Sequence, residues 1–296
     1  MDIGHGDEVI TVSHTAVATV AAIEATGAKA VLIDVEKKSY TLNPIYLENA
    51  LSKNTKAVVV VHLYGNAADL EPIQTFCNSK NLFLVEDASQ AHGAKYKGKR
   101  LGSIGDIGCF SCYPTKNLGA IGDAGLITTN NSDLANRVRM IREYGWKKRV
   151  SMLAGRNSRL DELQAAILRI KLKYLDSDNQ KRRNIAKFYY DQLSHLPIVM
   201  PEIRPSVEPV FHLFVIQVER QKMLLDFLKE EGILAGVHYP LPVHLHPAYI
   251  SRVTKSKDMS VTETIIKKII SLPIYPELSN NEATSIVNSV QKFYKK

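Results

Sequence analysis

Apolar segments of strand length alternate with segments of helical periodicity through the first half of the chain. Strands are predicted over residues 8–13, 28–35, 57–63, 82–86, 107–113 and 125–129. Helices are predicted over residues 16–25, 44–51 and 70–79, and the potential N-cap residues before them are Thr15, Asn43 and Asp69. This alternation predicts an α/β fold in which a mainly parallel sheet is sandwiched by helices.

The pattern changes after residue 132, where the chain becomes mostly helical up to about residue 193. An irregular stretch over residues 145–158 interrupts these helices, and a long helix is predicted to begin near Arg159. A proline-rich break over 196–209 precedes a strand at 211–218, a helix near 223–231, a loop at 238–247 and two closing helices. We therefore expect a large domain over residues 1–175 and a smaller C-terminal α/β domain over residues 176–296.

The composition is that of a folded globular protein, because 45% of the 296 residues are hydrophobic and 23% are charged. No stretch approaches the roughly 18 consecutive apolar residues of a membrane span, and the N-terminus lacks the features of a signal peptide. The three cysteines are sparse and odd in number, which favours a reducing compartment. We expect a cytoplasmic protein that contacts no membrane.

The formal net charge of +8 changes this picture little. The basic residues are spread along the chain, with small clusters at residues 147–149 and 181–183, and no nucleic-acid-binding motif accompanies them. A solvated surface, or attraction to a small phosphorylated substrate, explains the charge as well as nucleic acid does. We therefore expect no nucleic-acid partner.

Two charged residues stand where α/β proteins place their ligand sites. Asp87 follows a buried apolar strand, and open α/β sheets bind ligands at the carboxyl ends of their strands. Lys116 lies five residues after Ser111 and precedes a glycine-rich loop over residues 119–125, a pattern that suggests an anionic ligand held close to the backbone. The alternatives are an Asp87 that caps the next helix and a Lys116 that is a surface charge.

Asp87 together with Lys116 resembles the cofactor site of the fold-type I pyridoxal-phosphate enzymes, and more narrowly of the DegT/DnrJ/EryC1/StrS family of nucleotide-sugar aminotransferases. The resemblance covers almost the whole chain. Its ordered blocks are residues 6–10, 61–65, 86–93, 111–117, 157–166, 211–214, 237–240 and 271–273.

The resemblance implies that pyridoxal 5'-phosphate is the cofactor and that Lys116 binds it covalently and moves protons. It also implies that Asp87 pairs with the pyridinium nitrogen, that Gln90 lies near the ring 3-hydroxyl, and that Ser111 binds the phosphate. Asn157 is similar to a phosphate ligand that the neighbouring subunit donates in this family. The expected assembly is therefore a homodimer with shared active sites.

The reaction that the resemblance implies moves an amino group from an amino acid, usually glutamate, to a keto group of a nucleotide-linked 6-deoxy sugar. A dTDP-3-keto-6-deoxyhexose is the favoured substrate, and its product would enter a polysaccharide or a glycosylated natural product. In the loop over residues 237–246, His238 and His244 are candidate contacts of the sugar nucleotide. The alternative is that this proline-rich loop serves packing.

The chain departs from the family in two places. It is N-terminally short: relatives carry several tens of residues before the block at 6–10, including a helix start that binds the cofactor phosphate, where each lost charge-assisted hydrogen bond would cost about 1.5–3 kcal/mol. Ala16 stands where many relatives place an aromatic residue that stacks on the ring. One alternative is therefore a catalytically impaired truncated relative with a binding or regulatory role. Another is a sugar dehydratase of the same superfamily, against which Lys116 argues, because those enzymes carry histidine there.

Other polar groups suggest no further chemistry. Cys109 and Cys112 have the spacing of a zinc-binding pair, but no second pair accompanies them, and strand alternation places the two sulfurs on opposite faces. The histidines lack the spacing of metallohydrolases, so we expect no metal. Asp106 and Asp123 lie in glycine-rich turns, where short carboxylates usually accept local hydrogen bonds.

Overall fold

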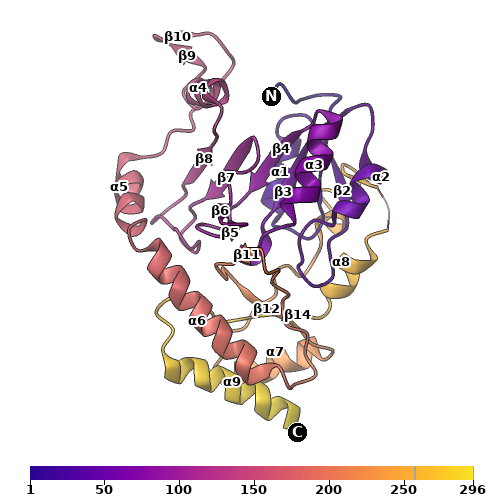
Figure 1. Ribbon diagram of the computed structural model, residues 1–296, viewed down its shortest axis with the longest axis vertical. Helices are drawn as coiled ribbons and strands as arrows, with labels where there is room; N and C mark the ends of the chain where they lie inside the picture. Colours follow the sequence, from indigo (N-terminus) through magenta and orange to yellow (C-terminus); the bar gives the residue numbers. More distant parts are fainter. Residues whose placement is uncertain (257, 296) are drawn as a thin grey trace.

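A seven-stranded sheet organises the first part of the chain in the computed structural model, which describes residues 1–256 and 258–295 (Figure 1). Strands from β13 to β7 are mutually parallel, and β8 is antiparallel to β7. The prediction of a mainly parallel sheet is therefore confirmed. The strand order is β13 (Thr254–Lys255), β2 (Lys29–Ile33), β1 (Glu8–Val12), β3 (Thr55–Val61), β4 (Phe83–Asp87), β7 (Ile107–Ser111) and β8 (Gly125–Thr128).

Helices cover both faces of this sheet, as the sequence predicts. Val9 of β1 packs in one apolar cluster with Val20 of α1 (Val17–Glu24), whereas its neighbour Ile10 packs in another with α2 (Leu47–Ala50) and α3 (Leu70–Lys80). Successive residues of a strand point to opposite faces, so apolar residues at consecutive positions are buried on both. Each such buried aliphatic side chain stabilises the fold by about 1.5–3 kcal/mol.

The N-cap predictions have different outcomes. Asn43 does cap, because its side-chain oxygen accepts a hydrogen bond from the Ile45 amide at 3.2 Å, at the start of the 3-10 helix η1 (Pro44–Tyr46). Thr15 does not cap α1, which begins after Ala16 without a side-chain cap. The Thr15 hydroxyl instead lies 3.0 Å from the Thr19 hydroxyl.

Asp69 does stand before α3, but its side chain makes no capping bond. Its carboxylate accepts a hydrogen bond from the Tyr96 hydroxyl at 2.6 Å. Asp106 was expected to accept local hydrogen bonds, yet its Oδ2 accepts from the Leu84 amide of β4 at 2.8 Å. In both cases a partner distant in sequence replaces the local one, because burial brings it within reach.

The region after β8 differs most from prediction. The stretch predicted as irregular contains a short hairpin, β9 (Trp146–Lys147) and β10 (Val150–Ser151), at the end of an arm that follows α4 (Ser132–Ile141) (Figure 1). A helix does begin near Arg159, at Glu162, but the predicted length is wrong, because a break separates α5 (Glu162–Lys171) from α6 (Leu175–Leu193). The strands β9 and β10 have two residues each, which is too few for an alternation of apolar and polar positions to appear in the sequence.

Another small sheet of this kind lies near the end of β4. It consists of β5 (Lys95–Tyr96) between β6 (Lys99–Arg100) and β11 (Val207–Glu208), all antiparallel. Because β5 and β6 lie in the first part of the chain and β11 follows α6, this small sheet joins the C-terminal part to the first part. The connection places residues 207–213 close to the edge that carries Asp87.

A second apolar core lies in the C-terminal part, where α6, α7 (Gln221–Glu230) and α9 (Asn280–Lys295) pack on the antiparallel pair β12 (Phe214–Gln217) and β14 (Ile269–Leu272). Two closing helices, α8 (Ser260–Ile265) and α9, are present as predicted. The proposed domain boundary after residue 175 coincides with the start of α6. Segments beyond it return to the first sheet, however, because β13 extends that sheet and Val243 and Met259 pack against α1 residues.

Within residues 1–256 and 258–295, no helix combines the length and apolar character needed to cross a membrane. Cys77, Cys109 and Cys112 are free thiols. In the same described part of the chain, no group of three His, Cys, Asp or Glu side chains is arranged to hold a metal ion.

Candidate active site

The candidate site lies at the carboxyl ends of β4 and β7. Asp87 is the last residue of β4 and pairs with Val61 of β3 and Cys109 of β7. Ser111 ends β7 two residues later. Because these strands are parallel, their carboxyl ends meet at one edge of the sheet, which is where α/β folds bind ligands.

Asp87 is held in place by two donors. Its Oδ2 accepts a hydrogen bond from the Thr19 hydroxyl of α1 at 2.7 Å, and its Oδ1 accepts from the Ser89 amide at 3.1 Å. The alternative in which Asp87 caps a following helix is wrong, because no helix follows in residues 88–92. The sequence analysis did not identify Thr19 as a partner of Asp87, although Thr19 lies three residues after Ala16. The two residues are 68 positions apart, and no local pattern links them.

The turn that carries Lys116 is closed by backbone hydrogen bonds. The Lys116 amide donates to the Tyr113 carbonyl at 2.9 Å, and the Ala120 amide donates to the Cys112 carbonyl at 2.8 Å. A Cβ atom on Gly119 would lie 2.4 Å from the Pro114 carbonyl oxygen, so only glycine fits there. The turn therefore presents Lys116 from a defined backbone.

The environment of Lys116 lowers the pKa of its amine. Partial burial lowers the pKa of the amine, and the Asp87 carboxylate raises it by a smaller amount, so that the pKa lies below that of an ordinary lysine. Among the described residues, no hydrogen-bond acceptor holds the amine. A larger fraction of Lys116 is consequently available as a nucleophile or base at neutral pH than for a lysine in water.

Three histidines lie within the electrostatic influence of Lys116. Burial, and secondly the Lys116 charge, lower the pKa values of His92, His212 and His238, that of His92 to about 4. All three rings are therefore neutral at pH 7. These three rings therefore add no positive charge to the surroundings of Lys116 at pH 7.

Gln90 is buried and joined to two tyrosines. Its Oε1 accepts from the Tyr64 amide at 2.7 Å, and its Nε2 donates to the Tyr239 hydroxyl at 3.0 Å. The Tyr64 hydroxyl in turn donates to the His238 carbonyl. Gln90 thus ties the 63–65 turn to the 237–240 block, and its place beside a cofactor ring stays a prediction.

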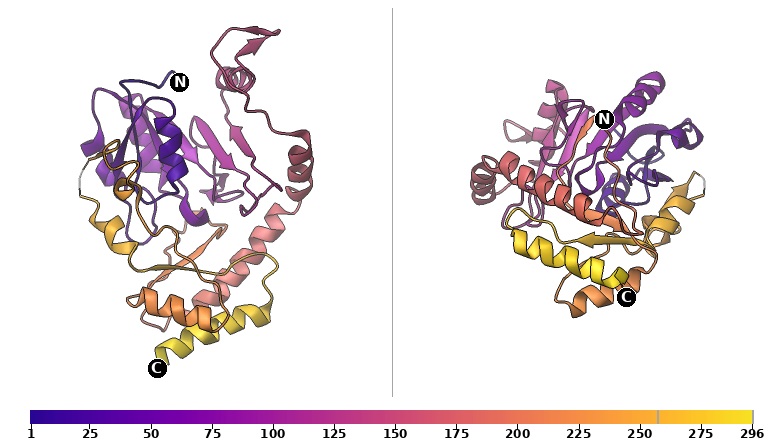
Figure 2. Two further views of the ribbon diagram at one scale, coloured as in Figure 1. Left: turned by 180° about the vertical axis from the view of Figure 1, so that it is seen from behind. Right: turned by 60° about the horizontal axis from the view of Figure 1, so that its bottom comes forward.

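Ser111 and Asn157 lie in very different surroundings. The Ser111 Oγ accepts from the Tyr113 amide at 3.3 Å, which leaves its hydroxyl hydrogen free to donate to an anion. Asn157 is exposed, and its Oδ1 accepts a hydrogen bond from Arg159 Nε at 3.1 Å. Its backbone forms an isolated antiparallel bridge with Glu143, on the arm that stands clear of the sheet (Figure 2). Within the described residues, no contact joins Asn157 to Lys116 of the same chain.

The two candidate histidines of the 237–246 loop differ in how many of their ring nitrogens are engaged by protein groups. His238 uses Nδ1 to bond the Ser271 hydroxyl at 2.8 Å, which leaves its Nε2 free. His244 is buried with both ring nitrogens engaged, Nδ1 with the Ser13 hydroxyl at 2.6 Å and Nε2 with Glu263 Oε1 at 3.0 Å. The ring of His244 therefore joins the end of β1 to α8, as the packing interpretation of the loop expects.

A buried hydrogen bond between His62 and Glu86, below the site, was not predicted. Burial raises the pKa of Glu86, but hydrogen bonds from His62 and from backbone amides outweigh it, so that the pKa is lowered. His62 Nδ1 accepts from the Ala68 amide at 3.3 Å, so Nε2 carries the hydrogen that faces Glu86 Oε2 at 3.0 Å. The other donors to Glu86 are the amides of Gly102, Ile104 and Gly105. Glu86 thus anchors the turn that leads into β7.

Taken together, the side chains at this edge fit a ligand with three features. The amine of Lys116, with its lowered pKa, suits an electrophilic carbon. The carboxylate of Asp87 suits a protonated nitrogen. The hydroxyl of Ser111 suits an anionic group such as a phosphate.

Comparison with known proteins agrees with this description of the site. The DegT/DnrJ/EryC1/StrS aminotransferase family matches residues 1–291. A dTDP-3-amino-3,6-dideoxy-alpha-D-galactopyranose transaminase of Aneurinibacillus thermoaerophilus is 44% identical, over 99% of this chain and 80% of that protein. A dTDP-3-amino-3,4,6-trideoxy-alpha-D-glucose transaminase of Streptomyces venezuelae is 41% identical, over 99% of this chain and 78% of that protein.

Solved structures agree. DesV of S. venezuelae, crystallised in complex with a ketimine intermediate, superposes with a TM-score of 0.96 at 42% identity, over 99% of this chain and 80% of that one. Bacillus subtilis ntda with bound cofactor PMP superposes with a TM-score of 0.91 at 30% identity, over 100% of this chain and 69% of that one.

Proposed function

The chain belongs to the DegT/DnrJ/EryC1/StrS aminotransferase family, whose members depend on pyridoxal phosphate, and we propose that Lys116 and Asp87 carry its reaction. The substrate is a nucleotide-linked 6-deoxy sugar with a keto group. A dTDP-3-keto-6-deoxyhexose is the favoured form, because two relatives at 41–44% identity are dTDP-3-amino-sugar transaminases. The observation that carries the proposal is the half-buried amine of Lys116, with a lowered pKa, beside Asp87.

The residues at the sheet edge fit the cofactor. Lys116 would hold its aldehyde carbon, Asp87 its protonated ring nitrogen and Ser111 its phosphate, while Gln90 closes one side. When bound, pyridoxal phosphate supplies the carbon that carries the amino group and a ring that accepts electrons.

Lys116 moves the protons. Its Nζ, once neutral, takes a proton from the carbon that loses the amino group and returns a proton to the carbon that gains it. A pKa below that of an ordinary lysine suits both directions, because the amine is then a base and its conjugate acid is strong enough to give the proton back. Asp87 keeps a negative charge opposite a ring nitrogen, and Thr19 and Ser89 fix its two oxygens.

The overall exchange is balanced without another reactant. An amino acid, which we take to be glutamate, gives up its amino group and becomes a 2-oxo acid. The sugar ketone becomes an amine at the same carbon. Water supplies the new carbonyl oxygen of the 2-oxo acid and the carbonyl oxygen of the sugar leaves as water, so the net exchange consumes no water. The product would enter a polysaccharide or a glycosylated natural product.

A second copy of this chain would complete the site. The arm that carries Asn157 exposes apolar side chains at its end, with Trp146 38%, Val150 60% and Met152 59% exposed. Exposed apolar groups on a projecting hairpin favour burial against a partner. We therefore propose a homodimer in which Asn157 reaches the partner's phosphate site, and, since the cysteines are free thiols, a cytoplasmic location.

Lys116→Ala tests the proposal. The unaltered chain, incubated with pyridoxal phosphate and reduced with borohydride, should carry the cofactor on the peptide that contains Lys116, and with glutamate it should convert a dTDP-3-keto-6-deoxyhexose into the amino sugar nucleotide, detected by mass spectrometry. Lys116→Ala should lose both, while its circular dichroism spectrum stays unchanged. Amino transfer by Lys116→Ala at the unaltered rate would contradict the assignment, and a chain that binds no cofactor would favour the binding or regulatory alternative.

A further inference from the structure

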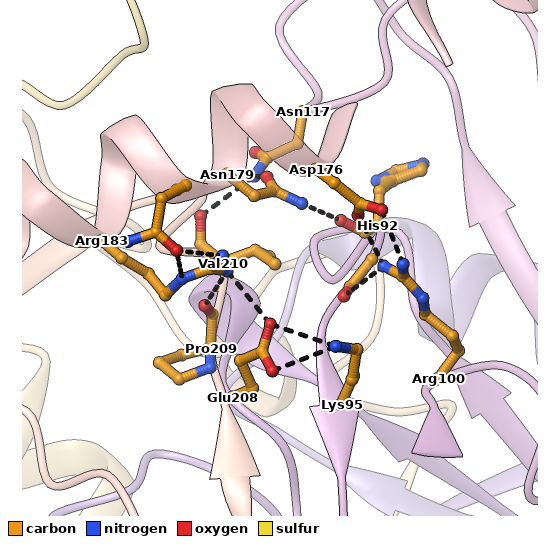
Figure 3. Close-up of polar contacts among 12 residues, drawn as sticks. His92, Lys95, Arg100, Asn117, Asp176, Asn179, Arg183, Glu208, Pro209 and Val210 are labelled. Atoms are coloured by element: carbon orange, nitrogen blue, oxygen red, sulfur yellow. Dashed lines mark hydrogen bonds and ion pairs between the residues drawn. The ribbon is translucent and has the colours of Figure 1, made fainter. Parts of the chain in front are cut away.

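The side chain of Asn117, the residue after Lys116, binds three residues that lie on two other segments of the chain. Asn117 Nδ2 donates to Asn179 Oδ1 at 2.9 Å and to the Val210 carbonyl at 3.0 Å. Asn117 Oδ1 lies 3.1 Å from His212 Nδ1, so that His212 carries its hydrogen on Nδ1 and donates it. Both hydrogens and the oxygen of this amide are therefore satisfied by protein groups, and Figure 3 shows the two bonds that Nδ2 donates, to Asn179 and Val210.

Asn179 fixes one side of this arrangement. It is 1% exposed on α6, and its Nδ2 donates to the His92 carbonyl at 2.8 Å. A Cβ atom on Gly93 would lie 2.8 Å from the same Nδ2, so the chain after His92 has no room for a larger residue. The Lys116 turn is thus linked through Asn179 to the segment that follows β4 and Asp87 (Figure 3).

Val210 and His212 fix the other side. The Val210 amide donates to the Gly65 carbonyl at 3.0 Å, and the Leu213 amide donates to the Tyr64 carbonyl at 3.3 Å. A Cβ atom on Gly65 would lie 2.9 Å from the backbone nitrogen of His212, so the backbones at Gly65 and His212 are in close contact. The partners of Asn117 on this side are consequently anchored themselves.

We propose that Asn117, Asn179 and His212 are positioning residues for Lys116, because together they fix the backbone from which its amine reaches the cofactor site. The proposal rests on the proposed function. Two observations support this proposal. The anchoring side-chain amide belongs to Asn117, the residue next to Lys116, and the Lys116 amine has no hydrogen-bond acceptor of its own among the described residues. The position of the amine therefore depends on the backbone of the turn that carries Lys116.

The test compares Asn117→Ala and Asn179→Ala with the control Arg183→Ala. Arg183 lies on the same helix as Asn179 and contacts the same segment, at the Pro209 carbonyl (3.4 Å) and Glu208 (3.6 Å), but it does not touch Asn117 (Figure 3). The first measurement is the rate at which borohydride traps pyridoxal phosphate on Lys116. We expect a loss of about tenfold to a hundredfold in Asn117→Ala and Asn179→Ala, since a misplacement of about 1 Å costs that much, and no change in Arg183→Ala.

The second measurement needs no cofactor. Competitive acetylation over a range of pH, read by mass spectrometry of the Lys116 peptide, reports the pKa of Lys116. In Asn117→Ala and Asn179→Ala we expect this pKa to move up toward that of an ordinary lysine, because a loosened turn exposes the amine to water. In steady-state assays kcat should fall while KM for the sugar nucleotide stays unchanged.

The outcomes are separable. Trapping rates and Lys116 pKa values in both variants equal to those of the unaltered chain would overturn the positioning role. Equal losses in Arg183→Ala would also overturn it, since they would indicate general loosening of the 207–213 segment. If either Asn117→Ala or Asn179→Ala does not fold, the remaining one of the two is compared with Arg183→Ala and tests the positioning role. A chain that is not trapped at all, yet shows the pKa shift, would reject the proposed function and keep the positioning of Lys116.

Discussion

At the scale of single residues, the site combines a lysine made less basic by burial with a carboxylate fixed by two donors. Replacing Asp87 with Asn keeps the Ser89 contact but removes the charge that would face the ring nitrogen. Asp87→Asn should still attach the cofactor to Lys116, while the rate of amino transfer falls by about 10²–10³-fold, comparable to the loss when one preorganised polar group that stabilises a transition state is removed. Cofactor trapping and single-turnover rates on the same sample check both parts. A fully active Asp87→Asn would make the assigned role wrong.

Two buried histidines should make the protein sensitive to mild acid. Burial lowers the pKa of both His14 and His92 from the ordinary 6.5 to about 4 in the folded state, with the Lys116 charge contributing at His92. The unfolded chain therefore binds these protons first, so each histidine contributes stability that is present above pH 6.5 and is lost as the pH falls toward 4. The loss reaches up to about 2 kcal/mol per histidine at pH 5.

Urea unfolding at pH 7 and pH 5 measures this effect. In His92→Gln the difference in unfolding free energy between the two pH values should be smaller than in the unaltered chain. Exposed His5 offers the matched control, and His5→Gln should leave the difference unchanged. An identical pH difference in all three proteins would contradict the titration of His92.

At the scale of elements, the Lys116 turn depends on a glycine that has no room for a side chain. Gly119→Ala would place Cβ 2.4 Å from the Pro114 carbonyl oxygen, and relieving that contact must move the turn. We expect a loss of about 1–3 kcal/mol of stability and slower cofactor trapping on Lys116. Gly4→Ala is the control, since its nearest neighbour, the Thr26 carbonyl, lies at an ordinary 3.4 Å. Chemical denaturation of both variants decides, and equal stabilities would show that the turn adapts.

Elements were predictable from sequence where periodicity is long. The six main strands and the helices α1, α3 and α7 lie within two residues of prediction, because burial on one or both faces leaves a repeating apolar pattern. The strands β5, β6, β9, β10, β11 and β13 have two residues each and leave no such pattern. The break between α5 and α6 was missed for a related reason, since residues 172–174 have helical composition.

At the scale of the whole molecule, the exposed arm predicts active sites shared between two copies. Asn157→Ala should weaken cofactor binding by about 1.5–3 kcal/mol, the contribution of one charge-assisted hydrogen bond. At limiting cofactor, mixing it with Lys116→Ala should restore activity that neither variant has alone, since one site of a mixed dimer contains both native residues. Activity assays on the mixture check this.

The control for that mixture is the double variant Lys116→Ala/Asn157→Ala, which should restore nothing when mixed with Asn157→Ala, because no subunit then supplies a native Asn157. Native mass spectrometry establishes that mixed dimers form. Mixed dimers without recovered activity would place Asn157 outside the partner's site, and a purely monomeric chain would reject the assembly itself.

The order of elements, the parallel sheet and the position of Asp87 at a strand end were contained in the sequence, because apolar alternation and turn residues act over a few neighbouring positions. Lys116 and Ser111 could be singled out in the same way. The partners of these residues were decided only by tertiary structure: Thr19 on Asp87, the Asn117–Asn179–His212 contacts beside Lys116, and the engagement of both His244 ring nitrogens. These contacts join residues between 19 and 231 positions apart, and a buried polar group takes whichever partner the packed chain brings within hydrogen-bond distance.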